Sequence, residues 1–186
     1  VLLLVMSIPV LSLRLGFGDE STFAEDTTTR QAYELLAEGF GAGSNGPLLV
    51  VAELDELSQL RAAQNLVATL NDADGVARAL GPIPSENEQA FQIFVVPETG
   101  PQDEATSALV RELRDTVIPG AVNGSGLDVK VTGAVASSID FSDYLGARLP
   151  VFFLAVLTLS FLLLLMVFRS VLVPLKAVIM NLLSIG

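Results

Sequence analysis

Two aspartates, Asp140 and Asp143, lie three positions apart and shortly precede a long uncharged run of the sequence. On a helix this spacing places both carboxyl groups on one face. A carboxyl pair could act as general acid and base if burial or mutual proximity shifted a pKa. The alternative is a solvated helix face with a role in helix capping, and we favour that alternative.

The glycine-rich stretch 39–46 (GFGAGSNG) superficially resembles a phosphate-binding loop. A nucleotide loop of that kind follows a strand and precedes a helix, so that the helix N-terminus meets the phosphate. Here the expected order is reversed, with a helix before the loop and a strand after it. We therefore interpret the stretch as a flexible turn. The sequon Asn123-Gly124-Ser125 is likewise explained by a loop before a strand.

The sequence contains no cysteine and no histidine. This composition excludes disulfides, thiol nucleophiles, imidazole bases and the usual zinc ligand sets within this sequence. The acidic residues Asp19, Glu20, Glu25 and Asp26 lack the spacing of a calcium-binding loop, and we interpret them as a solvated linker. We assign no catalytic, cofactor-binding or metal-binding residue and no cofactor, and we do not expect an enzyme.

Residues 149–168 (LPVFFLAVLTLSFLLLLMVF) carry no charged side chain. At about 1.5 Å per residue, a helix of this length matches the roughly 30 Å hydrocarbon core of a bilayer. We expect a complete transmembrane helix at 150–168, then a short cytoplasmic loop and the start of another transmembrane helix at 169–186. The apolar run 1–14 is too short to span alone and is expected to be the end of a truncated transmembrane helix. The chain is thus interpreted as a fragment of a multi-pass protein.

The acidic residues are confined to one part of the chain. All 21 lie between Asp19 and Asp143, and only seven basic residues occur between Asp19 and Arg148, which leaves a net charge of about −14. Such a surface repels phosphate backbones, so nucleic-acid binding is disfavoured. Arg169 and Lys176 favour a cytoplasmic position for the loop that holds them, and Arg14 counts against this orientation. We expect residues of about 15–149 to be extracytoplasmic.

The acidic part is predicted to be a linker with a helix (15–47), a folded domain (48–136) and a connecting helix (137–149). Its apolar and turn patterns predict strands at 48–54, 76–80, 90–96 and 127–132, and helices at 28–41, 55–71 and 103–117. From residue 48 onward the order is strand, helix, strand, strand, helix, strand. This is the order of the α+β ferredoxin-like (split βαβ) fold, an antiparallel sheet with two helices on one face.

Each predicted helix has an apolar stripe at helical spacing. The stripes are Ala32, Leu35, Leu36 and Phe40 in the first helix; Leu57, Leu60, Ala63, Leu66, Val67 and Leu70 in the second; and Ala105, Ala108, Leu109, Leu113 and Val117 in the third. Thr28 or Thr29 is the expected N-cap of the first helix, and Gly39 is expected to end it.

Four stretches together resemble one protein family. They are TTTRQAYELLAEGFG (27–41), NGPLLVV (45–51), DFSDYLGARLPVF (140–152) and FRSVLVPLKAVIMNLLSIG (168–186). They are similar to the MMPL (mycobacterial membrane protein large) transporters of the resistance-nodulation-division superfamily, and specifically to the second of the family's two internal repeats. The resemblance covers nearly the whole chain.

The resemblance implies a multi-pass protein of the bacterial inner membrane, with ferredoxin-like porter domains outside the cytoplasm. It implies export of lipids or other hydrophobic molecules, driven by proton flow. The family's proton relay pairs acidic and tyrosine residues on later helices, beyond Gly186, so Asp143 and Tyr144 are not assigned to it.

We therefore expect a fragment of a proton-driven membrane transporter that exports lipids or other hydrophobic molecules. Its expected partners are the lipid bilayer, a hydrophobic or lipid substrate and the remaining transmembrane helices of the full-length chain, and a homo-oligomer is left open. The alternative is the extracytoplasmic ligand-sensing domain of a membrane receptor. The apolar sequence after Phe168 disfavours that alternative, because a receptor is expected to continue into a soluble signalling domain.

Overall fold

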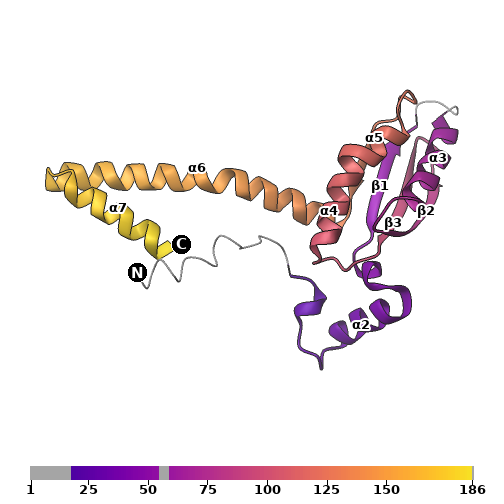
Figure 1. The fold of residues 1–186 in the computed structure, drawn as a ribbon, viewed down its shortest axis with the longest axis horizontal. Helices are drawn as coiled ribbons and strands as arrows, with labels where there is room; N and C mark the ends of the chain where they lie inside the picture. The colour runs from indigo at the N-terminus through magenta and orange to yellow at the C-terminus, as the bar shows by residue number, and fades with distance from the viewer. Residues whose placement is uncertain (1–17, 55–58, 186) are drawn as a thin grey trace. The chain divides into compact units, whose positions relative to one another are not determined.

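The computed structural model describes residues 18–54 and 59–185, with the side chains of residues 181–185 excepted (Figure 1). The predicted helix end at 1–14 therefore lies outside the described residues. The chain divides into two compact units at the boundary between Asp140 and Phe141. The first unit is an α+β domain, and the second consists of apolar helices, so each is described by itself.

The domain contains one four-stranded sheet formed by β1 (Leu48–Glu53), β2 (Val76–Pro84), β3 (Ala90–Pro97) and β4 (Val129–Thr132). The strand order is β2-β3-β1-β4, and every neighbouring pair is antiparallel. Helix α3 (Gln59–Asn71) connects β1 to β2, and helix α4 (Glu104–Glu112) begins the connection from β3 to β4. The predicted order of strands and helices is confirmed.

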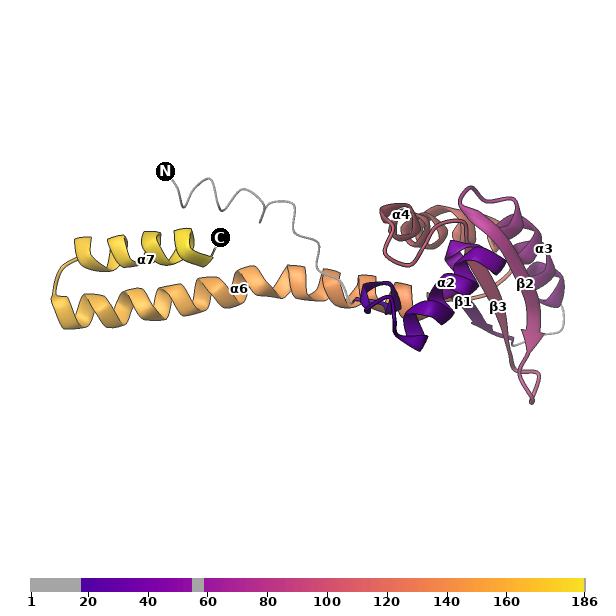
Figure 2. The same ribbon diagram turned by 90° about the horizontal axis from the view of Figure 1, so that it is seen from below.

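The core lies against one face of the sheet. Val50 on β1 is opposite Ile93 on β3 and Val131 on β4, and all three are buried. Because side chains alternate along a strand, these residues point to the same face. They form one cluster with Leu66 of α3 and Leu109 of α4, so both helices cover this face (Figure 2).

Strand β2 is longer than predicted. The sequence pattern placed its end at Leu80 and assigned the following Gly-Pro segment to a turn, but the strand continues to Pro84. The register shifts between Leu80 and Ile83, and Gly81 between them has a φ of 140°, which glycine tolerates best. A bulge of this kind lets a strand continue past residues that read as a turn.

The helix after β3 changes its winding. Helix α4 continues through a π-helical segment, η4 (Leu113–Val117), into the short helix α5 (Ile118–Ala121). The buried positions follow this change: Leu113 is followed by Ile118 five residues later, the spacing of a π-helix. Pro119 lies in the first turn of α5, a position at which a helix tolerates proline. The predicted burial of Ala105 and Ala108 is wrong, since both are exposed.

The buried side of α4 consists of Thr106, Leu109 and Val110. Thr106 is fully buried because its hydroxyl is satisfied, by a contact of 2.6 Å with the Thr99 hydroxyl and by a hydrogen bond to the Gly100 carbonyl. A pattern search for apolar residues alone overlooks such a threonine. On α3, Ala63, Leu66 and Leu70 are buried as predicted, while Leu57 lies outside the described residues.

Helix α2 (Thr28–Phe40) lies between two short 3-10 helices, η2 (Glu20–Thr22) and η3 (Ala42–Asn45). Its N-cap is Thr27, one residue before the predicted pair, and its C-cap is Gly41 rather than Gly39. None of its residues is buried. The predicted apolar stripe of Ala32, Leu35, Leu36 and Phe40 is exposed.

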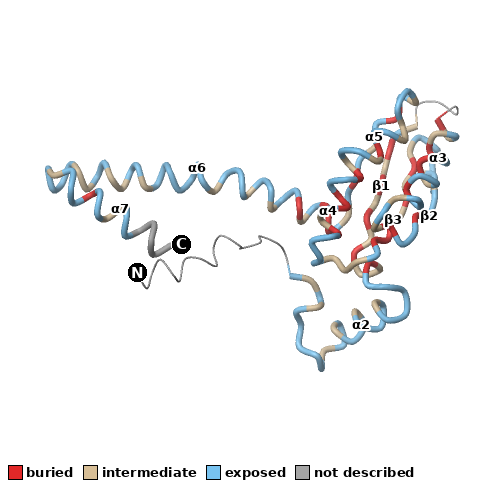
Figure 3. Tube along the Cα trace, viewed as in Figure 1, coloured by how far each residue is buried: buried red, intermediate tan, exposed pale blue. Residues whose placement is uncertain are grey.

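Helix α6 (Ala134–Phe168) is continuous and contains Pro150. The predicted connecting helix and the predicted transmembrane helix are thus one element of 35 residues. Helix α7 (Leu172–Ile185) follows after a short turn. Among the described residues, α6 is the helix long and apolar enough to cross a membrane; its most apolar window has a mean hydropathy of 2.9, and none of that window is buried (Figure 3).

Candidate functional site

The domain has an open cavity of about 610 Å³ beside strand β4. Its apolar lining comes from α5, from the loop that follows it and from β4, and its charged lining consists of two acid and two basic side chains. The lining residues are Arg114, Ile118, Pro119, Val122, Leu127, Asp128, Val129, Lys130, Val131 and Asp140. A cavity of this size and mixed lining is within the range that holds small ligands. Within the described residues it is the best candidate for a site.

Arg114 makes the most extensive set of polar contacts at this cavity. Its Nη1 donates to Oδ1 of Asp140, and its Nη2 donates to Oδ2 of Asp140 at 2.9 Å and to the backbone oxygen of Val131 at 2.8 Å. A two-pronged contact between guanidinium and carboxylate is the strongest geometry available to such a pair. The Arg114 side chain is 28% exposed and that of Asp140 is 57% exposed, so water screens the pair in part.

Three elements bring these groups together. Arg114 belongs to the π-helical segment η4, Val131 to strand β4, and Asp140 to the second turn of α6. Within the described residues, the order β2-β3-β1-β4 leaves one edge of β4 without a neighbouring strand in the sheet. Arg114 satisfies the carbonyl of Val131 on that edge, and charged groups at an edge strand discourage pairing with another chain.

Asp140 is not suited to act as a general acid or base at neutral pH, because its pKa is shifted away from neutrality. The hydrogen bond from Arg114 lowers the pKa of Asp140 below its ordinary value, and the guanidinium charge acts in the same direction. The sequence singled out Asp140 but not Arg114. The sequence alone offers no signal for Arg114, because Val117 continues the regular apolar stripe and the five-residue spacing of buried Leu113 and Ile118 is visible only in the structure.

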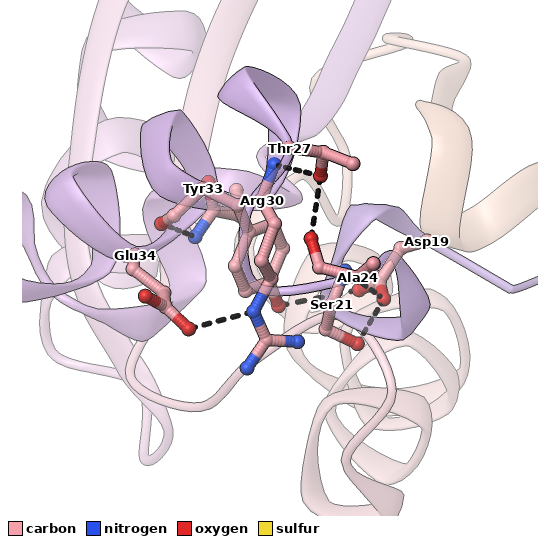
Figure 4. A network of polar contacts seen from close by, with 8 residues as sticks. Asp19, Ser21, Ala24, Thr27, Arg30, Tyr33 and Glu34 are labelled. Atoms are coloured by element: carbon pink, nitrogen blue, oxygen red, sulfur yellow. Dashed lines mark hydrogen bonds and ion pairs between the residues drawn. The ribbon is translucent and has the colours of Figure 1, made fainter.

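A second polar network joins the start of the domain to α2 (Figure 4). Oδ1 of Asp19 accepts from the backbone N–H of Ser21 at 3.1 Å and from its hydroxyl, and Oδ2 of Asp19 accepts from the Tyr33 hydroxyl at 3.2 Å. Burial and the neighbouring Asp19 charge raise the pKa of Tyr33. Asp19 is therefore a capping and hydrogen-bonding residue. Across the described ranges no cluster of acidic side chains is placed to hold a metal ion.

Two of the four glycines in stretch 39–46 serve close packing. Gly43 and Gly46 are buried. A Cβ on Gly43 would lie 1.9 Å from the backbone oxygen of Pro97, and one on Gly46 would lie 2.7 Å from the Pro101 ring. By contrast, a Cβ on Gly39 would meet nothing within 4 Å. The loop is a tight junction between η3 and the end of β3.

The sequon residues lie in the loop between α5 and β4, where the Ser125 hydroxyl donates to the Val122 carbonyl and accepts from the Leu127 N–H. This loop forms one side of the cavity through Val122 and Leu127. Its hydrogen bonds are those of a local turn.

Helix α6 begins in the core of the α+β domain and continues as a charge-free segment of membrane length. These features indicate the class of protein, which is a membrane protein with a folded domain outside the bilayer. The comparisons with known proteins narrow this class. A family model described as "MMPL family" matches residues 21–186. The chain belongs to the MMPL family of membrane transporters.

Individual relatives agree with this assignment. Membrane protein YdfJ of Bacillus subtilis is 41% identical over 179 residues, which are 95% of this chain and 24% of YdfJ. The mycolic acid-containing lipids exporter MmpL11 of Mycolicibacterium smegmatis is 27% identical over all of this chain and 20% of its own length. The trehalose monomycolate exporter MmpL3 of Mycobacterium tuberculosis is 26% identical over all of this chain and 20% of its own length. The chain thus spans between a fifth and a quarter of these curated relatives.

Proposed function

We propose that this chain is part of a proton-driven transporter that exports lipids or other hydrophobic molecules across a bacterial inner membrane. The observation that carries the proposal is helix α6, which begins in the core of an α+β domain and ends as a charge-free segment of membrane length. Membership of a family that includes named lipid exporters supports the substrate class.

In this proposal the domain is a ferredoxin-like porter domain that lies outside the cytoplasm. The strand order β2-β3-β1-β4, with two helix connections over one face, supports the fold assignment. The acidity of the domain and the basic residues Arg169 and Lys176 after α6 support the orientation. Helix α7, which is apolar directly after the turn, supports a multi-pass arrangement and disfavours the receptor alternative.

The proton relay in this proposal is formed by other membrane helices of the full-length protein. Residues 149–168 hold no ionisable side chain that could take part. One elementary charge that moves through 100 mV supplies about 2.3 kcal/mol. This energy matches the roughly 1–3 kcal/mol of a usual coupling between two sites. Proton movement elsewhere would shift the membrane helices, and α6 would transmit that shift to the domain.

The proposal is tested in a deletion strain that is complemented with the full-length gene. We expect the wild-type protein to restore lipids to the outer surface and the culture medium, as measured by lipid mass spectrometry, and an uncoupler to abolish the effect. If the lipid profiles of deleted and complemented strains are identical with and without the uncoupler, the transporter proposal is wrong.

The role of α6 as a lever is tested by insertion of two glycines after Gly146. Gly146 lies within the helix, so the insertion breaks the stiff connection between domain and membrane segment. We expect export to be lost at normal protein levels. The matched control is the same insertion after Glu88, an exposed position in the turn between β2 and β3 with a φ of 56°, which should leave export intact. Normal export by the Gly146 insertion protein would overturn the lever.

A further inference from the structure

We propose that Arg114 is a positioning residue that clamps the start of α6 to the wall of the β4 cavity, so that the position of α6 controls how far this cavity opens. The inference rests on the proposed function for its biological meaning, because it assigns α6 a target within the domain. The geometry itself concerns contacts within residues 114–140.

The first turns of α6 are built into the domain core. Val135, Ala136 and Ile139 are buried, with Ala136 at 0% exposure, and they belong to the same cluster as Leu48 of β1. Hydrophobic contacts of this kind resist separation but allow small sliding motions of packed helices. These contacts hold the start of α6 in the domain core.

Arg114 adds a directional contact at the end of this buried segment. Asp140 follows directly after buried Ile139, and it is the residue of α6 that the guanidinium of Arg114 holds. The same guanidinium holds the Val131 carbonyl on the edge of β4. Through one side chain, therefore, α6 is tied to both the sheet edge and the π-helical segment.

Asp140, Arg114 and Val131 are also three of the residues that line the cavity. A rotation or shift of α6 that draws Asp140 away from Arg114 removes one part of the cavity wall. It also releases the Arg114 side chain, which is itself part of the lining. The state of the ion pair therefore sets the opening of the cavity.

The partial exposure of the pair suits a joint that opens and closes. A fully buried pair would resist separation strongly, because each charge would be left without a partner in a dry environment. Here the side chains are 28% and 57% exposed, so water can solvate both groups when they part. Such pairs couple weakly and reversibly.

The test uses thiol labelling of the full-length protein in membranes, with any cysteine elsewhere in the full chain replaced. The present sequence has no cysteine, so Val122→Cys places a single probe on the cavity wall within it. The rate of reaction with a water-soluble maleimide reports the opening of the cavity. We expect Asp140→Asn to raise this rate about two- to fivefold. This is the change in an equilibrium that loss of a partly exposed ion pair is expected to cause.

The matched control is Asp128→Asn. Asp128 lines the same cavity, and its carboxylate is paired with Lys130 at 2.6 Å. We expect this variant to leave the labelling rate unchanged. An equal rise in both variants would mean that loss of any acid at the rim matters, and the clamp would be overturned.

The double variant Arg114→Gln with Asp140→Asn tests whether the two residues act through one contact. If the pair is the clamp, the second substitution removes nothing further, so we expect the double variant to label at the rate of Arg114→Gln alone. A rate equal to the product of the two single-variant effects would overturn the proposal. The labelling assay does not depend on transport, so it tests the clamp separately from the proposed function. If the labelling results are as expected but the lipid profile of the strain does not depend on the protein, the clamp proposal stands and the transporter proposal is wrong.

Discussion

The two units of the chain use the same apolar side chains in opposite ways. Ile93, at the centre of the sheet, is 0% exposed, whereas Leu159, at the centre of the charge-free segment of α6, is 61% exposed. The domain hides its apolar residues within itself, as a protein does that folds in water. The segment of α6 presents them outward along its length, as a helix does whose solvent is lipid. Burial therefore distinguishes the two units as clearly as composition does.

The largest expected effect comes from truncation of a core side chain. Ile93→Ala leaves a cavity between the sheet and its helices and should lower the free energy of unfolding of the domain by about 2–5 kcal/mol. Urea titration with pulse proteolysis in micelles measures this. The matched variant Leu159→Ala, on the exposed surface of α6, should leave domain unfolding unchanged. An equal loss in both variants would contradict the division into two units.

The converse change places a charge in each unit. Leu159→Arg should make membrane insertion of the segment less favourable by about 2.5–3.5 kcal/mol, the cost of an arginine at the centre of a membrane helix. Gln64→Arg, on the exposed side of α3, should change neither insertion nor unfolding. The inserted fraction in a translocon assay measures the first effect. Insertion of the arginine variant as efficient as wild type would contradict a position of residue 159 at the centre of a membrane helix.

A smaller effect separates two glycines of one loop. Gly43→Ala would force its Cβ against the Pro97 carbonyl and should destabilise the domain by about 1–3 kcal/mol. Gly39→Ala, in the last turn of α2 with open space around it, should stabilise helix α2 by about 0.5–1 kcal/mol. Thermal unfolding and amide hydrogen exchange of α2 measure the two changes. Destabilisation of the same size by both substitutions would remove the packing role of Gly43.

The sequence predicted the parts of the fold that depend on short-range patterns. The strand and helix order, the stripe of α3 and the apolar segment of α6 follow from periodicity, and each is present. The sequence prediction was wrong where a local feature departed from the pattern. Strand β2 continues past the irregularity at Gly81, and the polar residue Thr106 is buried in the core because its hydroxyl is hydrogen-bonded. These depend on contacts with other elements, which periodicity does not contain.

The candidate site was the least predictable part. Asp140 was noticed for its spacing to Asp143, but its partner is Arg114, 26 positions earlier in the chain. A pairing across that distance requires the register of β4, the winding of η4 and the start of α6 together. The exposed stripe of α2 is the opposite case, since its pattern is strong while the described residues leave it uncovered. Periodicity indicates which face is apolar, and tertiary structure decides what covers it.

Acid provides the finest test of the difference between the units, because residues 149–168 contain nothing that titrates. The pKa of Asp140 is lowered by Arg114, so the native state prefers the ionised carboxyl. Its contribution to stability is thus complete above the ordinary carboxyl value of about 3.9 and is lost as the pH falls through the lowered pKa. We expect the difference in unfolding free energy between wild type and Asp140→Asn to be small at neutral pH. It should shrink toward zero as the pH falls through the lowered pKa of Asp140. A difference that grows on acidification would mean that the folded domain favours the protonated acid, and Arg114 would not be its partner in solution.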